Sequence, residues 1–294
     1  MRQNNVNRAK YIFWIFIPCI LAFVIQNIAS IIVVEGYAAY GIGTFKGQTW
    51  DEFMDYLMDV MMSGITDGLI YVLYSVVGIA LFGACYHKMF MTGKSYSLKG
   101  ISKNIPITIV GMLLFCIGMQ YVSIFLLNSL ASAFPEWLEQ YEQILESAGI
   151  SEDISVMMAV YAVILGPVVE ELIFRGVTLS AANKVMPYYF AIVVQALLFG
   201  AFHMNAIQSC YAFVLGLGLG YIMYLYDNIW LTIIIHILYN IVGTFFSDIL
   251  PMAGDTLIEF FFSVLFALVM CYGALVLLKK SAASVKDEAD FTDI

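Results

Sequence analysis

Long apolar runs separated by short polar stretches dominate the chain, and their lengths approach the roughly 20 residues that a helix needs to cross a bilayer. The pattern predicts an all-α fold, a polytopic membrane helix bundle with about eight transmembrane helices. The predicted spans are residues 11–34, 64–86, 105–128, 153–178, 187–204, 209–226, 229–247 and 257–278.

Two further stretches, residues 49–62 and 135–148, repeat apolar side chains at helical spacing opposite acidic ones. Each is predicted to form an amphipathic helix that lies on the outer membrane surface. A role as a lid or a substrate-docking surface stays open. Within the span 209–226, Ala212, Gly216 and Gly220 place a small residue at every fourth position, which lets neighbouring helices approach closely.

Composition supports the membrane assignment. Apolar residues make up 62% of the chain and charged residues 12%, about half the usual share in soluble domains. The net charge of −9 comes largely from the acidic outer loops and the C-terminal tail, so no nucleic-acid partner is expected.

The distribution of basic residues orients the bundle, because cytoplasmic loops carry an excess of Lys and Arg. With the N-terminus inside, Lys46 is the one basic residue expected outside, and both termini are cytoplasmic. The compact chain favours a bacterial cell membrane. The basic residues expected on the inner side are Arg2, Arg8, Lys10, Lys88, Lys94, Lys99, Lys103, Lys184, Lys279, Lys280 and Lys286.

No internal repeat is evident, so we expect one membrane domain with three zones. Residues 1–150 form an N-terminal three-span zone with the outer amphipathic helices. Residues 151–250 carry the ionisable residues that interrupt the apolar runs, and they form the expected catalytic core. Residues 251–294 supply the last span and a cytoplasmic tail.

Ionisable residues interrupt three of the apolar runs in this core zone. Each costs roughly 2.5 kcal/mol or more at the centre of a membrane helix, so such groups persist where they pair or do chemistry. Their presence on neighbouring segments predicts a polar site inside the bundle. They are Glu170, Glu171, Arg175, His203 and His236.

The spacing of these residues suggests separate tasks. Glu171 and Arg175 stand four residues apart with the acid first, which favours an ion pair. Glu170 points about 100° away from its neighbour along a helix, so it can face another part of the bundle. An arginine that neutralises one carboxylate leaves the other free to act as a base. His236 and Asn240 share a helix face, because they too are four residues apart.

This set suits hydrolysis of a peptide bond. Glu170 can take a proton from a water molecule that His203 also holds, while His236 and Asn240 donate hydrogen bonds to the developing oxyanion. Two alternatives stay open at this point. The charges can form a network that only locks the helices, or Glu170, His203 and His236 can complete a zinc site with one open position.

Three motifs within residues 154–247 resemble the signature motifs of the CPBP family of intramembrane proteases. That family includes the type II CAAX prenyl endopeptidases and proteins of bacteriocin processing or self-immunity. The motifs are Glu170-Glu171-x-x-Phe174-Arg175, then Phe199-x-x-x-His203, then His236-x-x-x-Asn240.

The resemblance implies an eight-span fold with a cavity inside the membrane, where Glu170 and His203 activate water and His236 and Asn240 bind the oxyanion. The family has been described both as metal-dependent and as metal-independent. We favour no cofactor, since no His-Glu-x-x-His helix is present, and zinc stays the alternative. The resemblance assigns supporting roles to Glu171, Arg175, Phe174 and Phe199.

The expected partners are a peptide or protein substrate at the membrane and the lipid bilayer itself. Whether the substrate is prenylated or a secreted peptide is open from the sequence. A non-catalytic scaffold or a bacteriocin self-immunity protein is the main alternative to a peptidase. An ion carrier is disfavoured, because such carriers show inverted repeats and paired broken helices.

Overall fold

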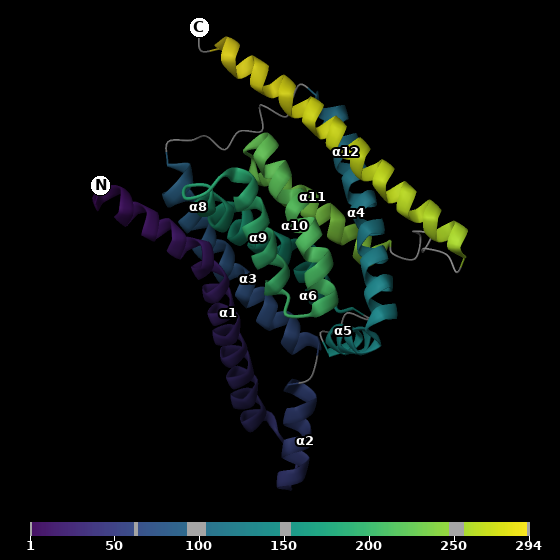
Figure 1. Cartoon of the computed structure of the whole chain (residues 1–294). Coiled ribbons are helices and arrows are strands. Elements are labelled where there is room, and N and C mark those ends of the chain that lie inside the picture. The colour runs from purple at the N-terminus through teal and green to yellow at the C-terminus, as the bar shows by residue number, and fades with distance from the viewer. Residues whose placement is uncertain (1, 62–63, 93–103, 148–153, 247–255, 293–294) are drawn as a thin grey trace.

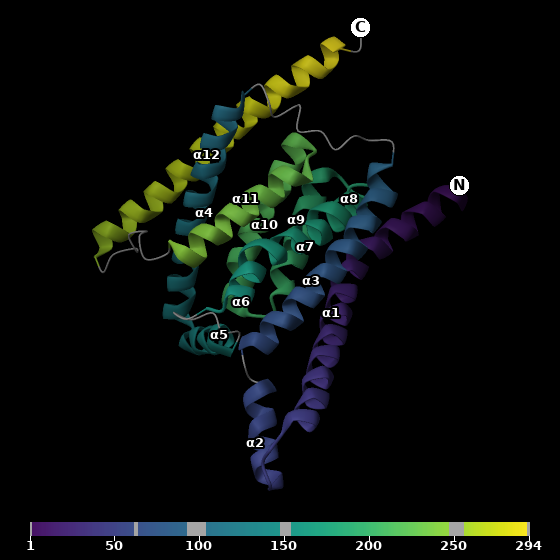
Figure 2. The same cartoon turned by 180° about the vertical axis from the view of Figure 1, so that it is seen from behind.

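The computed structural model describes residues 2–61, 64–92, 104–147, 154–246 and 256–292. These residues form helices joined by short turns and include no strand, which confirms the all-α prediction. The outer helices are α1 (Arg2–Thr44), α3 (Gly64–Tyr86), α4 (Ile105–Ala133) and α12 (Leu257–Thr292). The π-helical turn η1 (His87–Met91) directly follows α3. α12 packs mainly against α4 on one side of the bundle, and α1 packs against α3 on the other (Figures 1 and 2).

The centre of the bundle is built from the segment 156–182 and three helices that follow it. The segment is one continuous helical stretch in which α6 (Val156–Val160), α7 (Gly166–Glu171) and α8 (Ser180–Ala182) alternate with the π-helical turns η3 (Tyr161–Leu165) and η4 (Leu172–Leu179). Next come α9 (Tyr188–Phe202), α10 (Ala206–Tyr226) and α11 (Ile229–Phe245).

Six helical stretches within the described ranges are long and apolar enough to cross a membrane. The predictions 187–204 and 229–247 coincide with the shorter helices α9 and α11, of 15 and 17 residues. At 1.5 Å per residue these helices are about 23–26 Å long, less than the roughly 30 Å hydrocarbon core. A count of eight complete spans is therefore not confirmed.

Large apolar side chains cover the outer surface of the bundle. On α12, Phe261, Phe262 and Leu268 are each more than 60% exposed. An exposed apolar surface of this extent needs lipid around it. The chain is thus an integral membrane protein.

Close packing joins α9 to α10, and small residues permit it as predicted. A Cβ atom at Gly216 would lie 3.0 Å from the Cα atom of Ala196, so only glycine fits without a backbone shift. The Gln195 side-chain amide donates a hydrogen bond of 2.7 Å to the Gly216 carbonyl across the same contact. Between the helices Met204 takes a left-handed conformation (φ 53°), and the Asn205 side chain caps α10.

The two predicted amphipathic stretches form α2 (Trp50–Met61) and α5 (Pro135–Ser147). α2 packs against the end of α1 and lies outside the main bundle (Figure 1). α5 packs against α4 and α10, where the hydroxyl oxygens of Tyr141 and Tyr211 lie 3.4 Å apart. The position of either helix on a membrane surface stays a prediction.

Candidate active site

An ion pair forms within the helical segment that holds the two glutamates. The Nη1 atom of Arg175 lies 2.8 Å from Oε1 of Glu171, and both side chains are fully buried. Glu171 ends α7 and Arg175 lies in η4, one turn later. The predicted pair is therefore formed, and each buried charge has a partner of opposite sign.

His236 on α11 lies between the two carboxylates. Its Nδ1 atom is 2.8 Å from Oε1 of Glu171, and its Nε2 atom is 3.6 Å from Oε2 of Glu170. The two glutamates thus lie at different nitrogens of the same ring, a shared contact that their spacing along the helix did not predict. An imidazole carries a nitrogen on two of its edges, so one ring reaches two side chains that point in different directions.

The two carboxylates differ in their access to the site. Glu171 is fully buried between Arg175 and His236, whereas the Glu170 side chain is 15% exposed. The contact between Glu170 and His236 is also longer than a hydrogen bond. Glu170 is thus the carboxylate of the pair that an incoming molecule can reach.

His203 follows directly after α9 and is fixed through one ring nitrogen. Its Nδ1 atom lies 2.8 Å from the carbonyl oxygen of Phe199. A carbonyl oxygen only accepts, so Nδ1 donates and the neutral ring keeps Nε2 as an acceptor. The ring lies within electrostatic range of Glu170, Arg175 and His236.

The Phe199 ring occupies the centre of the site. Its centroid lies 5.0 Å from that of His203 and 5.8 Å from that of His236, with both histidines edge-on. The guanidinium carbon of Arg175 lies over the same ring at 4.5 Å, a cation–π distance. Phe174 packs against Phe199 at 5.0 Å, so the two phenylalanines that the motifs named hold the polar groups apart and in place.

Asn240 shares the helix face of His236, as predicted, and both residues contact the segment 156–182. Its side-chain amide donates a hydrogen bond of 2.8 Å to the carbonyl of Ala162 in η3. A primary amide carries two donor hydrogens. One of them holds α11 against η3.

Tyr74 on α3 is a buried polar residue near Glu170 that the sequence reasoning missed. It is 2% exposed, and its hydroxyl has no hydrogen-bond partner among the described residues. The hydroxyl lies within electrostatic range of Glu170, because α3 packs against α7 beside Val169. A tyrosine inside an apolar run gives no signal of its own, so only the packing of α3 reveals it.

The alternative zinc site would take its ligands from Glu170, His203 and His236. Within the described ranges, no three His, Cys, Asp or Glu side chains form a group that could hold a metal ion. The Nδ1 atom of His236 contacts Glu171 and that of His203 contacts the Phe199 carbonyl, which leaves the Nε2 atoms facing the site, as in histidines that bind a metal. Independence of cofactors stays a prediction.

Two glutamates, an arginine and two histidines thus lie together inside a membrane helix bundle. Comparison with known families adds a second result. Residues 152–242 match the family model described as type II CAAX prenyl endopeptidase Rce1-like, which includes every residue of the three motifs.

The match covers about a third of the chain and confirms the resemblance to the CPBP family over those residues. It implies a peptidase activity in a membrane protein. No curated protein and no solved structure matches the chain.

Proposed function

We propose that this protein is an intramembrane endopeptidase that hydrolyses a peptide bond of a membrane-associated or secreted peptide or protein. The observation that carries the proposal is the unequal environment of the two glutamates. Glu171 is buried between Arg175 and His236, while Glu170 is partly exposed beside the same imidazole. One carboxylate positions the ring, and the other is left to act on water.

In the proposed reaction a water molecule donates hydrogen bonds to Glu170 and to Nε2 of His203. Glu170 takes a proton from this water as the oxygen attacks the carbonyl carbon of the scissile bond. The new C–O bond turns the carbonyl into an oxyanion. Glu170 then returns the proton to the amide nitrogen, and the C–N bond breaks to give a carboxylic acid and an amine.

His236 and Asn240 are proposed to stabilise the oxyanion. The Nδ1–H of His236 donates to Glu171, so this role requires the ring to carry a second proton on Nε2. The Nε2 atom lies 3.6 Å from Glu170, beyond hydrogen-bond distance, and can therefore donate to the substrate. Glu171 and Arg175 are positioning residues, since they act through His236.

The substrate class and the cellular setting are also proposals. The family description names CAAX prenyl endopeptidases, so a substrate with a lipid-modified C-terminus is one candidate class, and an unmodified secreted peptide is the other. A bacterial cell membrane with both termini in the cytoplasm is the proposed setting. The bilayer and the substrate are the only partners that the site requires.

Mass-spectrometric profiling of new peptide termini in host membranes tests the proposal. Cells expressing the wild-type chain are compared with cells expressing Glu170→Gln at matched levels, and Glu35→Gln on the exposed face of α1 is the control. We expect termini that appear with wild type and with Glu35→Gln and are absent with Glu170→Gln. Their sequences identify the substrate class.

Identical profiles for folded, membrane-inserted wild type and Glu170→Gln would overturn the proposal. A non-catalytic scaffold or self-immunity protein would then be the function to pursue by co-purification.

A further inference from the structure

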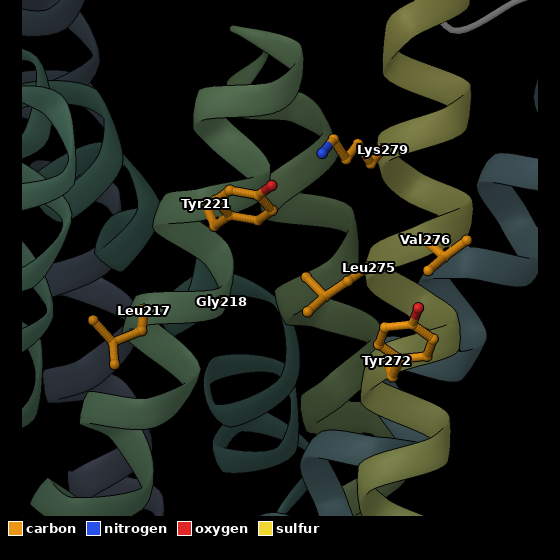
Figure 3. Close-up of a pocket in the computed structure, with 7 residues that line it drawn as sticks. All are labelled: Leu217, Gly218, Tyr221, Tyr272, Leu275, Val276 and Lys279. Atoms are coloured by element: carbon orange, nitrogen blue, oxygen red, sulfur yellow. The ribbon is translucent and has the colours of Figure 1, made fainter.

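A groove with a volume of about 570 Å³ runs between α10 and α12, away from the candidate active site. This volume is within the range of about 300–1,000 Å³ that small-molecule sites have. Leu275 and Lys279 extend from α12 toward α10, and the Tyr221 ring extends from α10 toward α12 (Figure 3). The lining residues are Leu217, Gly218, Tyr221, Tyr272, Leu275, Val276 and Lys279.

The groove exists because α10 and α12 each pack on α4 and have few contacts with each other. Gly218 lets α10 approach α4 closely, since a Cβ atom there would lie 2.7 Å from the Phe115 ring of α4. A hydrogen bond of 2.9 Å from the Tyr226 hydroxyl to the Leu278 carbonyl joins α10 and α12 beside Lys279. The groove faces outward, where Tyr272, Leu275 and Val276 are exposed.

The groove has apolar walls and a positive charge at one end, which match the acyl chain and the phosphate of a phospholipid. Leu217, Leu275 and Val276 form apolar walls. Lys279 lies seven residues beyond Tyr272, or about 10 Å along the helix axis, in the last turn of the apolar stretch Ile258–Ala282. An ammonium group at this depth lies at the level of the lipid headgroups.

We propose that this groove binds an anionic phospholipid, with one acyl chain along the apolar walls and the phosphate at Lys279. Charge complementarity carries the assignment, because Lys279 and the adjacent Lys280 are both exposed and none of the described residues that line the groove is a carboxylate. A peptide segment fits less well, since the walls offer few partners for its backbone N–H and C=O groups. The site is independent of the proposed peptidase activity.

Native mass spectrometry of the purified full chain tests the assignment, with phosphatidylglycerol and phosphatidylcholine titrated in parallel. We expect wild type to retain one phosphatidylglycerol in preference to phosphatidylcholine. Lys279→Gln removes the charge and should reduce this preference about fivefold, the factor that one lysine near an anionic lipid contributes. Lys280→Gln, beside the groove, is the matched control and should change the preference less.

Leu275→Trp keeps both lysines and fills part of the groove, so it should weaken retention of both lipids while the helix content by circular dichroism stays unchanged. Equal retention of the two lipids by wild type would overturn the proposal. Unchanged retention by folded Leu275→Trp, or equal effects of the two lysine substitutions, would place the lipid elsewhere and overturn it as well.

Discussion

At the scale of single residues, His236 is the side chain that links the two carboxylates of the site. Sequence spacing identified Glu170, Glu171, Arg175, His203, His236 and Asn240 as the polar residues of the core. It gave no means of seeing that one imidazole contacts both carboxylates, because that contact depends on how α11 packs against α7. Tyr74 was hidden for the same reason.

Glu171→Gln should destabilise the fold far more than Glu170→Gln. Removing Glu171 leaves a fully buried Arg175 without its counter-ion, and breaking a buried pair in this way costs about 3–5 kcal/mol. Glu170 makes only a long contact and is partly exposed. Thermal unfolding of the two detergent-solubilised variants measures the difference, and equal losses of stability would contradict the assigned division of roles.

Tyr74→Phe should leave stability unchanged or raise it, while turnover falls. The lost hydroxyl is buried without a partner among the described residues, and such a group carries a desolvation penalty of about 1–3 kcal/mol. Thermal unfolding and cleavage of the substrate found by terminal profiling are the two measurements. A variant that is less stable and fully active would show that Tyr74 only fills the core.

At the scale of elements, hydrophobic periodicity predicted where the helices lie and missed their irregularities. The π-helical turns η3 and η4 flank Gly166–Glu171, and Pro167, which cannot donate a backbone hydrogen bond, lies three residues before Glu170. π-helical turns occur often at functional sites. An apolar run has the same composition whether its backbone bonds span four residues or five, so this departure is invisible in the sequence.

Gly216→Ala and Gly36→Ala form a matched pair that tests the contact between α9 and α10. Both exchanges favour the helix by up to about 1 kcal/mol through propensity. The new Cβ atom at position 216 would lie 3.0 Å from the Cα atom of Ala196, whereas nothing lies within 4 Å at position 36. Gly216→Ala should therefore lower the unfolding temperature and the turnover, since His203 directly follows α9, and Gly36→Ala should lower neither.

At the scale of the whole molecule, the exposed apolar surface confirms the membrane assignment that composition gave. The beginning of α1 and the end of α12 both lie toward the upper edge of Figures 1 and 2. The orientation of the bundle in a bilayer rests on the basic residues alone. The number of complete crossings could not be read from apolar runs, because α9 and α11 are shorter than the runs that contain them.

Topology reporters test the predicted orientation. A cysteine introduced at Lys46 should react with a membrane-impermeant maleimide in intact cells, and a fluorescent protein fused to the C-terminus should fluoresce in the cytoplasm. Labelling at position 46 only after the membrane is permeabilised would reverse the assignment. The test uses the full chain and does not depend on its activity.

The ion pair within one helical segment also has a consequence for biosynthesis. Glu171 and Arg175 enter the membrane together, so the segment brings its own counter-ion and does not wait for a later helix to neutralise it. His236 follows Glu171 by 65 residues and is synthesised only after α9 and α10. A nascent chain therefore carries both carboxylates before it has the imidazole that completes the site, and under the proposed function it has no peptidase activity until α11 has been inserted.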